Sequence, residues 1–248
     1  MKLQNVQIQT QGALLSALRY LPEGDMRPVA LLFTHGFTSG KHSMDSLASY
    51  LAGKGFEGLT FDFVGHKLGG SGGELRSMEE AAENLHDTLK WLRANSNAER
   101  IVLVGHSMGA AAALRVAANE SKTLNQDPEA PLTQPIAGIA CICIGIDPFK
   151  GFEGEIGKAM LKQRSDYVAG ASAETLLYEL NVMVFSAREI GAIPALFIAA
   201  KQDVLVSAER VEALAALASN SVVVRIDSSH LEGPDRSRPA LFQWLNQL

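Results

Sequence analysis

Residues 105–109 read Gly-His-Ser-Met-Gly, and this pentapeptide is the part of the sequence best suited to chemistry. It fits the pattern G-x-S-x-G, in which a serine lies on a tight turn between a strand and a helix. The apolar run 101–104 precedes it and an alanine-rich run follows it, so both elements are expected. The two glycines would let the chain reverse without side-chain collisions and would expose the Ser107 hydroxyl as a nucleophile.

A serine hydroxyl is a weak nucleophile at neutral pH, so a general base must accept its proton. Among the six histidines we favour His230, because it follows the last expected strand and would reach the same edge of the sheet as the serine. Asp203 follows the preceding strand and would orient the imidazole, in the chain order Ser, Asp, His. Asp147, one strand earlier, is the alternative acid, and Asp227 ranks last.

The tetrahedral intermediate of acyl transfer carries an oxyanion that needs two N–H donors. We expect one donor to be the amide of Met108, at the positive end of the following helix. The other would be the amide of Phe37, in the loop after the apolar run 29–34, where Gly36 allows a close backbone approach. We expect the substrate to contact six further residues: His35, Gly36, His106, Asp147, Leu177 and Leu205.

These residues must be positioned by apolar runs that alternate with helical patterns along most of the chain. We expect strands at 6–10, 14–20, 29–34, 58–63, 100–104, 136–146, 195–200 and 222–226. Helices are expected at 43–52, 78–92, 107–118, 208–218 and 239–248. This order predicts an α/β fold with a mostly parallel, eight-stranded sheet and helices on both of its faces.

The alternation stops between about residues 149 and 191, where two helical patterns, 156–164 and 173–185, occur without a strand. An insertion at this point would cover the carboxyl ends of the strands, where open α/β sheets bind ligands. We therefore divide the chain into a core segment 1–148, a helical lid 149–191 and a second core segment 192–248. The apolar residues of the lid could line a pocket, form a dimer contact or pack on the core.

Composition narrows the possible partners. The 22 Lys and Arg residues against 27 Asp and Glu give a net charge of −5 without a basic cluster, which argues against nucleic acid. We see neither a signal peptide nor a run long enough to span a membrane, so a cytoplasmic location is expected. Cys141 and Cys143 should lie on one face of a strand as buried apolar residues, and no Cys/His spacing indicates a metal site.

The segments 31–41, 60–63 and 104–109 make the chain resemble the α/β-hydrolase family over nearly its whole length. The likeness is to small bacterial carboxylesterases, including the cinnamoyl/feruloyl esterase-like group, and in outline to monoacylglycerol lipases. It implies an α/β-hydrolase fold and a cofactor-free Ser-His-Asp enzyme that cleaves small to medium acyl esters through an acyl-enzyme. Residues 62–71 are longer and richer in glycine than the family pattern, which leaves His66 and Lys67 either at the cleft or facing water.

The same nucleophile and oxyanion site would serve several other reactions, because fold and triad do not determine the substrate. A thioesterase, a C–C bond hydrolase and a lactonase therefore stay open as alternatives. A ligand-binding protein with a vestigial triad is a third class of function. The expected partner is a small-molecule acyl ester, and a homodimer is possible.

Overall fold

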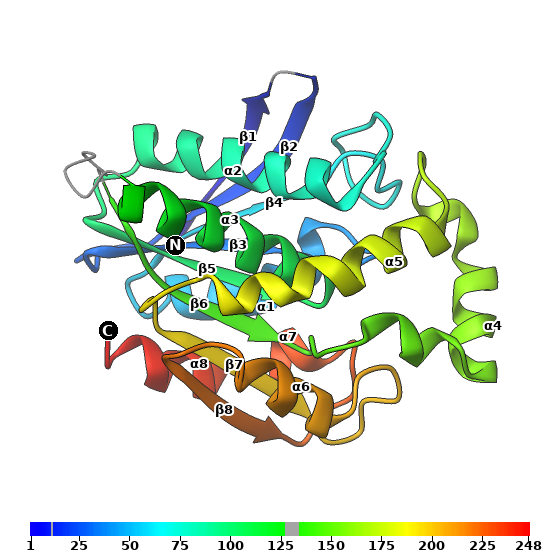
Figure 1. The fold of residues 1–248 in the computed structure, drawn as a ribbon. Helices are drawn as coiled ribbons and strands as arrows, with labels where there is room; N and C mark the ends of the chain where they lie inside the picture. The colour runs from blue at the N-terminus through cyan, green and yellow to red at the C-terminus, as the bar shows by residue number, and fades with distance from the viewer. Residues whose placement is uncertain (11, 127–133) are drawn as a thin grey trace.

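The computed structural model of the protein describes residues 1–10, 12–126 and 134–248. Within them, eight strands form one sheet in the order β1-β2-β4-β3-β5-β6-β7-β8 (Figure 1). β1 and β2 form an antiparallel hairpin, β2 pairs antiparallel with β4, and all other pairs are parallel. The strands are β1 Lys2–Gln9, β2 Leu14–Leu21, β3 Val29–Thr34, β4 Glu57–Phe61, β5 Arg100–His106, β6 Ile136–Ile142, β7 Ala195–Ala200 and β8 Ser221–Ile226. The predicted α/β fold is confirmed.

Helices cover both faces of this sheet, because the central strands are apolar on both sides. In β3, Ala30 and Leu32 pack into one core cluster, whereas Leu31 and Phe33 pack into the other. The first cluster lies beneath α2 Met78–Asn95, α3 Met108–Gln126 and α6 Ala208–Ala215. The second lies beneath α1 Asp45–Ala52 and α8 Arg238–Leu245. None of the described helices is long and apolar enough to cross a membrane.

The insertion between β6 and β7 consists of helices, as its pattern predicts. It contains α4 Glu155–Gln163 and α5 Ala173–Met183, together with the 3-10 turns η2 Pro148–Phe152, η3 Ser165–Tyr167 and η4 Val184–Arg188. Buried residues of α5, Leu177 among them, pack against the core, and α5 contacts α2 and α3. Two isolated β-bridges, from His66 to Val168 and from Leu75 to Gly170, tie the insertion to the segment after β4. In Figure 1, α4 lies beyond one end of the sheet, and α5 runs back from that end alongside α3.

The two cysteines do not share a face of the sheet, so that expectation is wrong. Cys141 lies in β6 and packs into the cluster beneath α3. Cys143 lies just beyond the end of β6 with φ of 54° and packs into the opposite cluster. The left-handed backbone at Cys143 interrupts the two-residue alternation of the strand, which the sequence does not signal. Both side chains are buried, as predicted.

Candidate active site

Ser107 lies on a sharp turn between β5 and α3, and its backbone has φ of 51°. This left-handed conformation is unfavourable for a residue that carries a Cβ. Two backbone hydrogen bonds hold it: the Ser107 amide donates to the Ile142 carbonyl at 2.8 Å, and the Ser107 carbonyl accepts from the Ala110 amide at 2.9 Å. The strained serine thus lies at the carboxyl end of the central strand, with its side chain lining a cavity.

Both glycines of the pentapeptide are required by close backbone contacts. A Cβ added at Gly105 would lie 2.4 Å from the Cα of Ala110. A Cβ added at Gly109 would lie 2.6 Å from the carbonyl oxygen of His35. Neither backbone neighbour can move aside without disturbing β3 or α3, so the turn can form only with glycine at these two positions.

His230 and Asp203 meet at the same end of the sheet. The His230 Nδ1 and Asp203 Oδ2 atoms are 2.6 Å apart, and the Asp203 side chain is fully buried. The other carboxylate oxygen accepts from the amides of Leu205, at 2.8 Å, and Val206, at 2.9 Å, which fixes the orientation of the carboxylate. With its Nδ1 proton donated to Asp203, the imidazole keeps Nε2 as the acceptor that a general base needs.

The two other candidate acids lie elsewhere. Asp147 is exposed, has φ of 48° and precedes the η2 turn. The Asp227 side chain is 77% exposed and pairs with Lys201 at 3.0 Å. Of the three carboxylates considered from the sequence, Asp203 is therefore the one that contacts the imidazole.

A cavity that is partly open to solvent connects the serine with the histidine, and its empty space, the open part included, is about 640 Å³. Its apolar wall comes from the loop after β3, the insertion and the loops before α6 and α7. The lining residues are Gly36, Phe37, Thr38, Ser39, Ser43, His106, Ser107, Phe152, Met160, Leu161, Arg164, Leu205, His230 and Leu231. Three of the expected substrate contacts, Gly36, His106 and Leu205, are among them.

The other three expected substrate contacts do not line the cavity. Leu177 is buried in the core beneath α5, and Asp147 faces solvent. The His35 ring is fully buried behind the cavity wall, where Nδ1 lies 2.9 Å from the Gly36 carbonyl oxygen and Nε2 accepts from the Phe63 amide at 3.2 Å. His35 therefore links the loops after β3 and β4. Burial and the neighbouring His66 lower its pKa to about 3, so the ring is neutral.

The expected oxyanion donors belong to two segments next to Ser107, the start of α3 and the loop after β3. Met108 is the first residue of α3, and the first amides of a helix lack partners within it. Phe37 lines the cavity, and the preceding Gly36 lies against the nucleophile: a Cβ added there would be 3.4 Å from Ser107 Cβ and 3.0 Å from His106 Nδ1. A larger residue at Gly36 would therefore be in tight contact with the His106 ring and with Ser107.

His106 has a contact that the sequence does not reveal. Its Nε2 atom lies 2.9 Å from the carbonyl oxygen of His230, and the two rings are 5.0 Å apart. Burial, reinforced by His230, lowers the pKa of His106 to about 3. The neutral ring therefore donates from Nε2 and holds the backbone of His230 in place. The sequence does not reveal this contact, because it depends on the direction in which the His106 ring turns at the end of β5.

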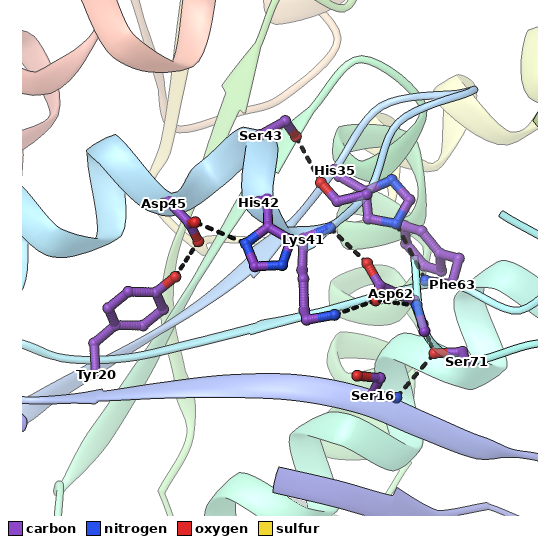
Figure 2. A network of polar contacts seen from close by, with 12 residues as sticks. Ser16, Tyr20, His35, Lys41, His42, Ser43, Asp45, Asp62, Phe63 and Ser71 are labelled. Carbon is purple, nitrogen blue, oxygen red and sulfur yellow. Dashed lines mark hydrogen bonds and ion pairs between the residues drawn. The ribbon is translucent and has the colours of Figure 1, made fainter. Parts of the chain in front are cut away.

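A buried ion pair supports the loop that carries Phe37 (Figure 2). The Asp62 carboxylate accepts from the Lys41 amide at 2.6 Å, from Lys41 Nζ and from the Gly70 amide at 2.7 Å. Burial would raise the pKa of Asp62, but Lys41 and the amide donors outweigh it and hold the pKa below its usual value. The ionised carboxylate thus joins the loop after β3 to the glycine-rich segment after β4.

His66 lies neither at the cleft nor in water. Its side chain is 1% exposed, and its ring packs edge-on against His35 with centroids 4.8 Å apart. Nδ1 lies 3.1 Å from the Val64 carbonyl oxygen, and burial lowers the pKa of the ring to about 4. Lys67, by contrast, is exposed.

One group of potential metal ligands occurs within the described residues: His106, Cys143 and His230, with ligand atoms within 4.8 Å of one another. Burial and the nearby Asp203 raise the pKa of the Cys143 thiol, whereas a metal would require the thiolate. One nitrogen of each ring is also engaged, with Asp203 or with the His230 carbonyl. The donor set therefore suits a hydrogen-bonded base better than a metal ion.

Comparison with models of known protein families assigns the chain to one of them. The model of the alpha/beta hydrolase family matches residues 31–242, which include every residue of the site described above. The chain belongs to the alpha/beta hydrolase family. A comparison with curated protein sequences gives no match.

Solved structures share this alpha/beta hydrolase fold over whole chains. Est1E of Butyrivibrio proteoclasticus, in a structure with ferulic acid bound, has a TM-score of 0.73 and 17% identity, with 98% of each chain covered. An esterase domain from a Rhodothermus marinus protein has a TM-score of 0.69 and 21% identity, covering 100% of this chain and 99% of that one. A Pyrococcus furiosus esterase has a TM-score of 0.68 and 20% identity, covering 99% and 90%. At these identities the likeness establishes the fold.

Proposed function

We propose that this alpha/beta hydrolase cleaves carboxylic esters of small to medium acyl groups, with Ser107 as nucleophile, His230 as general base and Asp203 as the orienting acid. One observation carries the proposal: the imidazole bonded to Asp203 at 2.6 Å lines the same cavity as the strained serine. The structural likeness to proteins named as esterases supports it.

The reaction would begin when the Ser107 hydroxyl adds to the ester carbonyl while its proton passes to Nε2 of His230. The amides of Phe37 and Met108 would stabilise the oxyanion that forms. When the intermediate collapses, the bond to the alkoxy group breaks, and the imidazolium donates its proton to the departing alcohol. A water molecule, activated by the same imidazole, would then hydrolyse the acyl-enzyme and release the carboxylic acid.

The cavity wall supports an acyl group of limited size. Phe37, Phe152, Met160, Leu161 and Leu205 supply apolar surface close to the serine. Beside this apolar surface the cavity takes in open solvent. Part of that space is open, so the ester would enter from solvent past the insertion 149–191, which we propose acts as the lid.

A fluorophosphonate probe tests the nucleophile directly. We expect the wild type to be labelled once and to hydrolyse 4-nitrophenyl butanoate, and Ser107→Ala to lose both properties. Ser207→Ala is the matched control, because Ser207 is an exposed serine outside the cavity. Labelling or turnover that persists in Ser107→Ala would contradict the proposal.

A substrate panel distinguishes the reaction types that share this site. Oxygen esters, acyl thioesters and β-diketones with matched acyl groups would be compared by kcat/KM. A tenfold preference for the thioester, about 1.4 kcal/mol of transition-state discrimination, would reassign the protein as a thioesterase. Stoichiometric labelling without turnover of any member would instead favour a binding protein with a vestigial triad.

A further inference from the structure

Arg164 is a charged residue in the cavity wall that the proposed mechanism does not use. It lies at the carboxyl end of α4 and is half-buried. Among the described residues that line the cavity, it is the one permanent charge, because the others are apolar, hydroxyl-bearing or histidine side chains. No aspartate or glutamate belongs to that lining, so an anion entering the cavity would meet no carboxylate there.

The guanidinium lies beside the expected oxyanion loop. Its Nη1 atom donates to Thr38 Oγ1 at 3.3 Å, and Thr38 directly follows Phe37. The guanidinium carbon also lies 5.7 Å from the centre of the Tyr167 ring. Both partners are neutral, and within the part of the chain that the structure describes these two contacts use a small part of the five N–H donors of an arginine. The remaining donors form a fork that matches the geometry of a carboxylate.

The apolar surroundings strengthen the attraction of this charge for an anion. Met160 and Leu161, on the same helix, line the cavity beside Arg164. In such a wall an ion pair is screened less than it would be on the open surface. A positive charge that served only to complement the dipole of α4 could lie in solvent, as the exposed Lys158 of the same helix does. Arg164 instead lines the cavity.

We propose that the natural ester carries a carboxylate group, in its acyl or its alcohol part, and that Arg164 binds this carboxylate. The inference rests on the proposed ester hydrolysis and names the substrate class of that site. Arg164 would determine substrate specificity and would take no part in the bond changes, because it would contact the carboxylate of the substrate and not the reacting carbonyl. The ester would then span from Ser107 to the carboxyl end of α4.

Two pairs of esters test both positions of the charge. The first pair is 4-carboxyphenyl butanoate and 4-carbamoylphenyl butanoate, which place the carboxylate or its amide on the alcohol side. The second is the monophenyl ester of adipic acid and the phenyl ester of adipic acid monoamide, which place it on the acyl side. Within each pair shape and size are matched, so the ratio of the two kcat/KM values reports recognition of the charge.

We expect Arg164→Gln to lower this ratio about 10- to 100-fold in one of the two pairs, the range of a lost charge-assisted hydrogen bond. Arg164→Lys should retain part of the ratio, because the charge remains while the fork is lost. Lys158→Gln, which removes an exposed charge from the same helix, should leave both ratios within about twofold of the wild type. Each activity is normalised to fluorophosphonate-labelled enzyme, so that misfolded protein does not count.

The outcomes separate this inference from the function on which it rests. If the wild type is labelled at Ser107 and cleaves the esters, but Arg164→Gln leaves both ratios within twofold, the carboxylate proposal is wrong and ester hydrolysis stands. An equal loss in Lys158→Gln would also overturn it, because a general charge effect would then explain the result. If the wild type is neither labelled nor able to cleave any of the four esters, both proposals fail.

Discussion

Three buried histidines should make this protein unusually sensitive to mild acid. His35, His66 and His106 are 0%, 1% and 5% exposed. Burial is the main reason that their pKa values fall to about 3, 4 and 3, respectively. In the unfolded chain each ring regains the ordinary histidine pKa of about 6.5. The unfolded state therefore binds three protons in a pH range where the folded state binds none of them.

The sign and size of the effect follow from this difference. Stability falls with decreasing pH wherever the unfolded state holds more protons, which here means from about pH 6.5 down to about pH 4. Each such proton contributes a slope of about 1.4 kcal/mol per pH unit. Three histidines together give about 4 kcal/mol per pH unit once the unfolded rings are protonated. Above about pH 8 the three rings should contribute almost no pH dependence.

Urea unfolding at pH 7.5, 6.0 and 5.5 would measure this slope. His66→Phe is the informative variant, because the ring packs edge-on against His35 and Phe37 and a phenyl ring cannot titrate. We expect it to remove about one third of the slope, whatever its stability at pH 7.5. Gln7→Ala is the control, because Gln7 is exposed in β1 and does not titrate, so the slope should stay unchanged.

Two results would refute this reasoning. One is a free energy of unfolding that stays constant between pH 7.5 and 5.5, which would mean that the buried rings accept protons without unfolding. The other is a slope in His66→Phe equal to that of the wild type, which would place the proton uptake on other groups.

Three further predictions concern the elements that hold the site. Asp203→Asn should lower kcat/KM for 4-nitrophenyl butanoate by about 10³- to 10⁴-fold, whereas Asp147→Asn, at an exposed position, should stay within about twofold. Gly105→Ala should lower the free energy of unfolding in urea by about 1–3 kcal/mol or more, and Gly12→Ala, with open space around its Cα, by less than about 0.5 kcal/mol. Lys41→Met should cost about 3–5 kcal/mol in the same assay, because it leaves the charge of its buried carboxylate partner uncompensated.

The strands and helices can be predicted from the sequence because each has its own pattern of apolar residues. The contact between His230 and Asp203 can be predicted because both residues follow parallel strands. Parallel strands end at the same edge of a sheet, so residues that directly follow different strands are brought together there. The runs 29–34 and 195–200 agree with β3 and β7 residue by residue. Close contacts at Gly105 and Gly109 give the physical reason for the glycines of the pentapeptide.

The rest of the site depends on contacts that no local pattern encodes. The backbone at Cys143 takes a positive φ although cysteine has no preference for it, and this moves its side chain to the opposite face. Arg164 reaches the cavity because of how the insertion folds back on the loop after β3, and helical periodicity gives no information about that direction. The burial of His35 and His66 likewise depends on how two loops pack against each other.

The supports of the site and its sensitivity to acid have a common origin. His35 can accept from the Phe63 amide only while its Nε2 lacks a proton. His106 donates to the His230 carbonyl from a ring whose burial disfavours a charge, so protonation would oppose the buried position from which it makes this bond. A second proton on His106 would also place a buried charge on a ring centred 5.0 Å from that of His230, and His230 contributes to the lowered pKa of His106. Loss of these neutral supports should therefore limit the fold in acid together with the geometry of the proposed base.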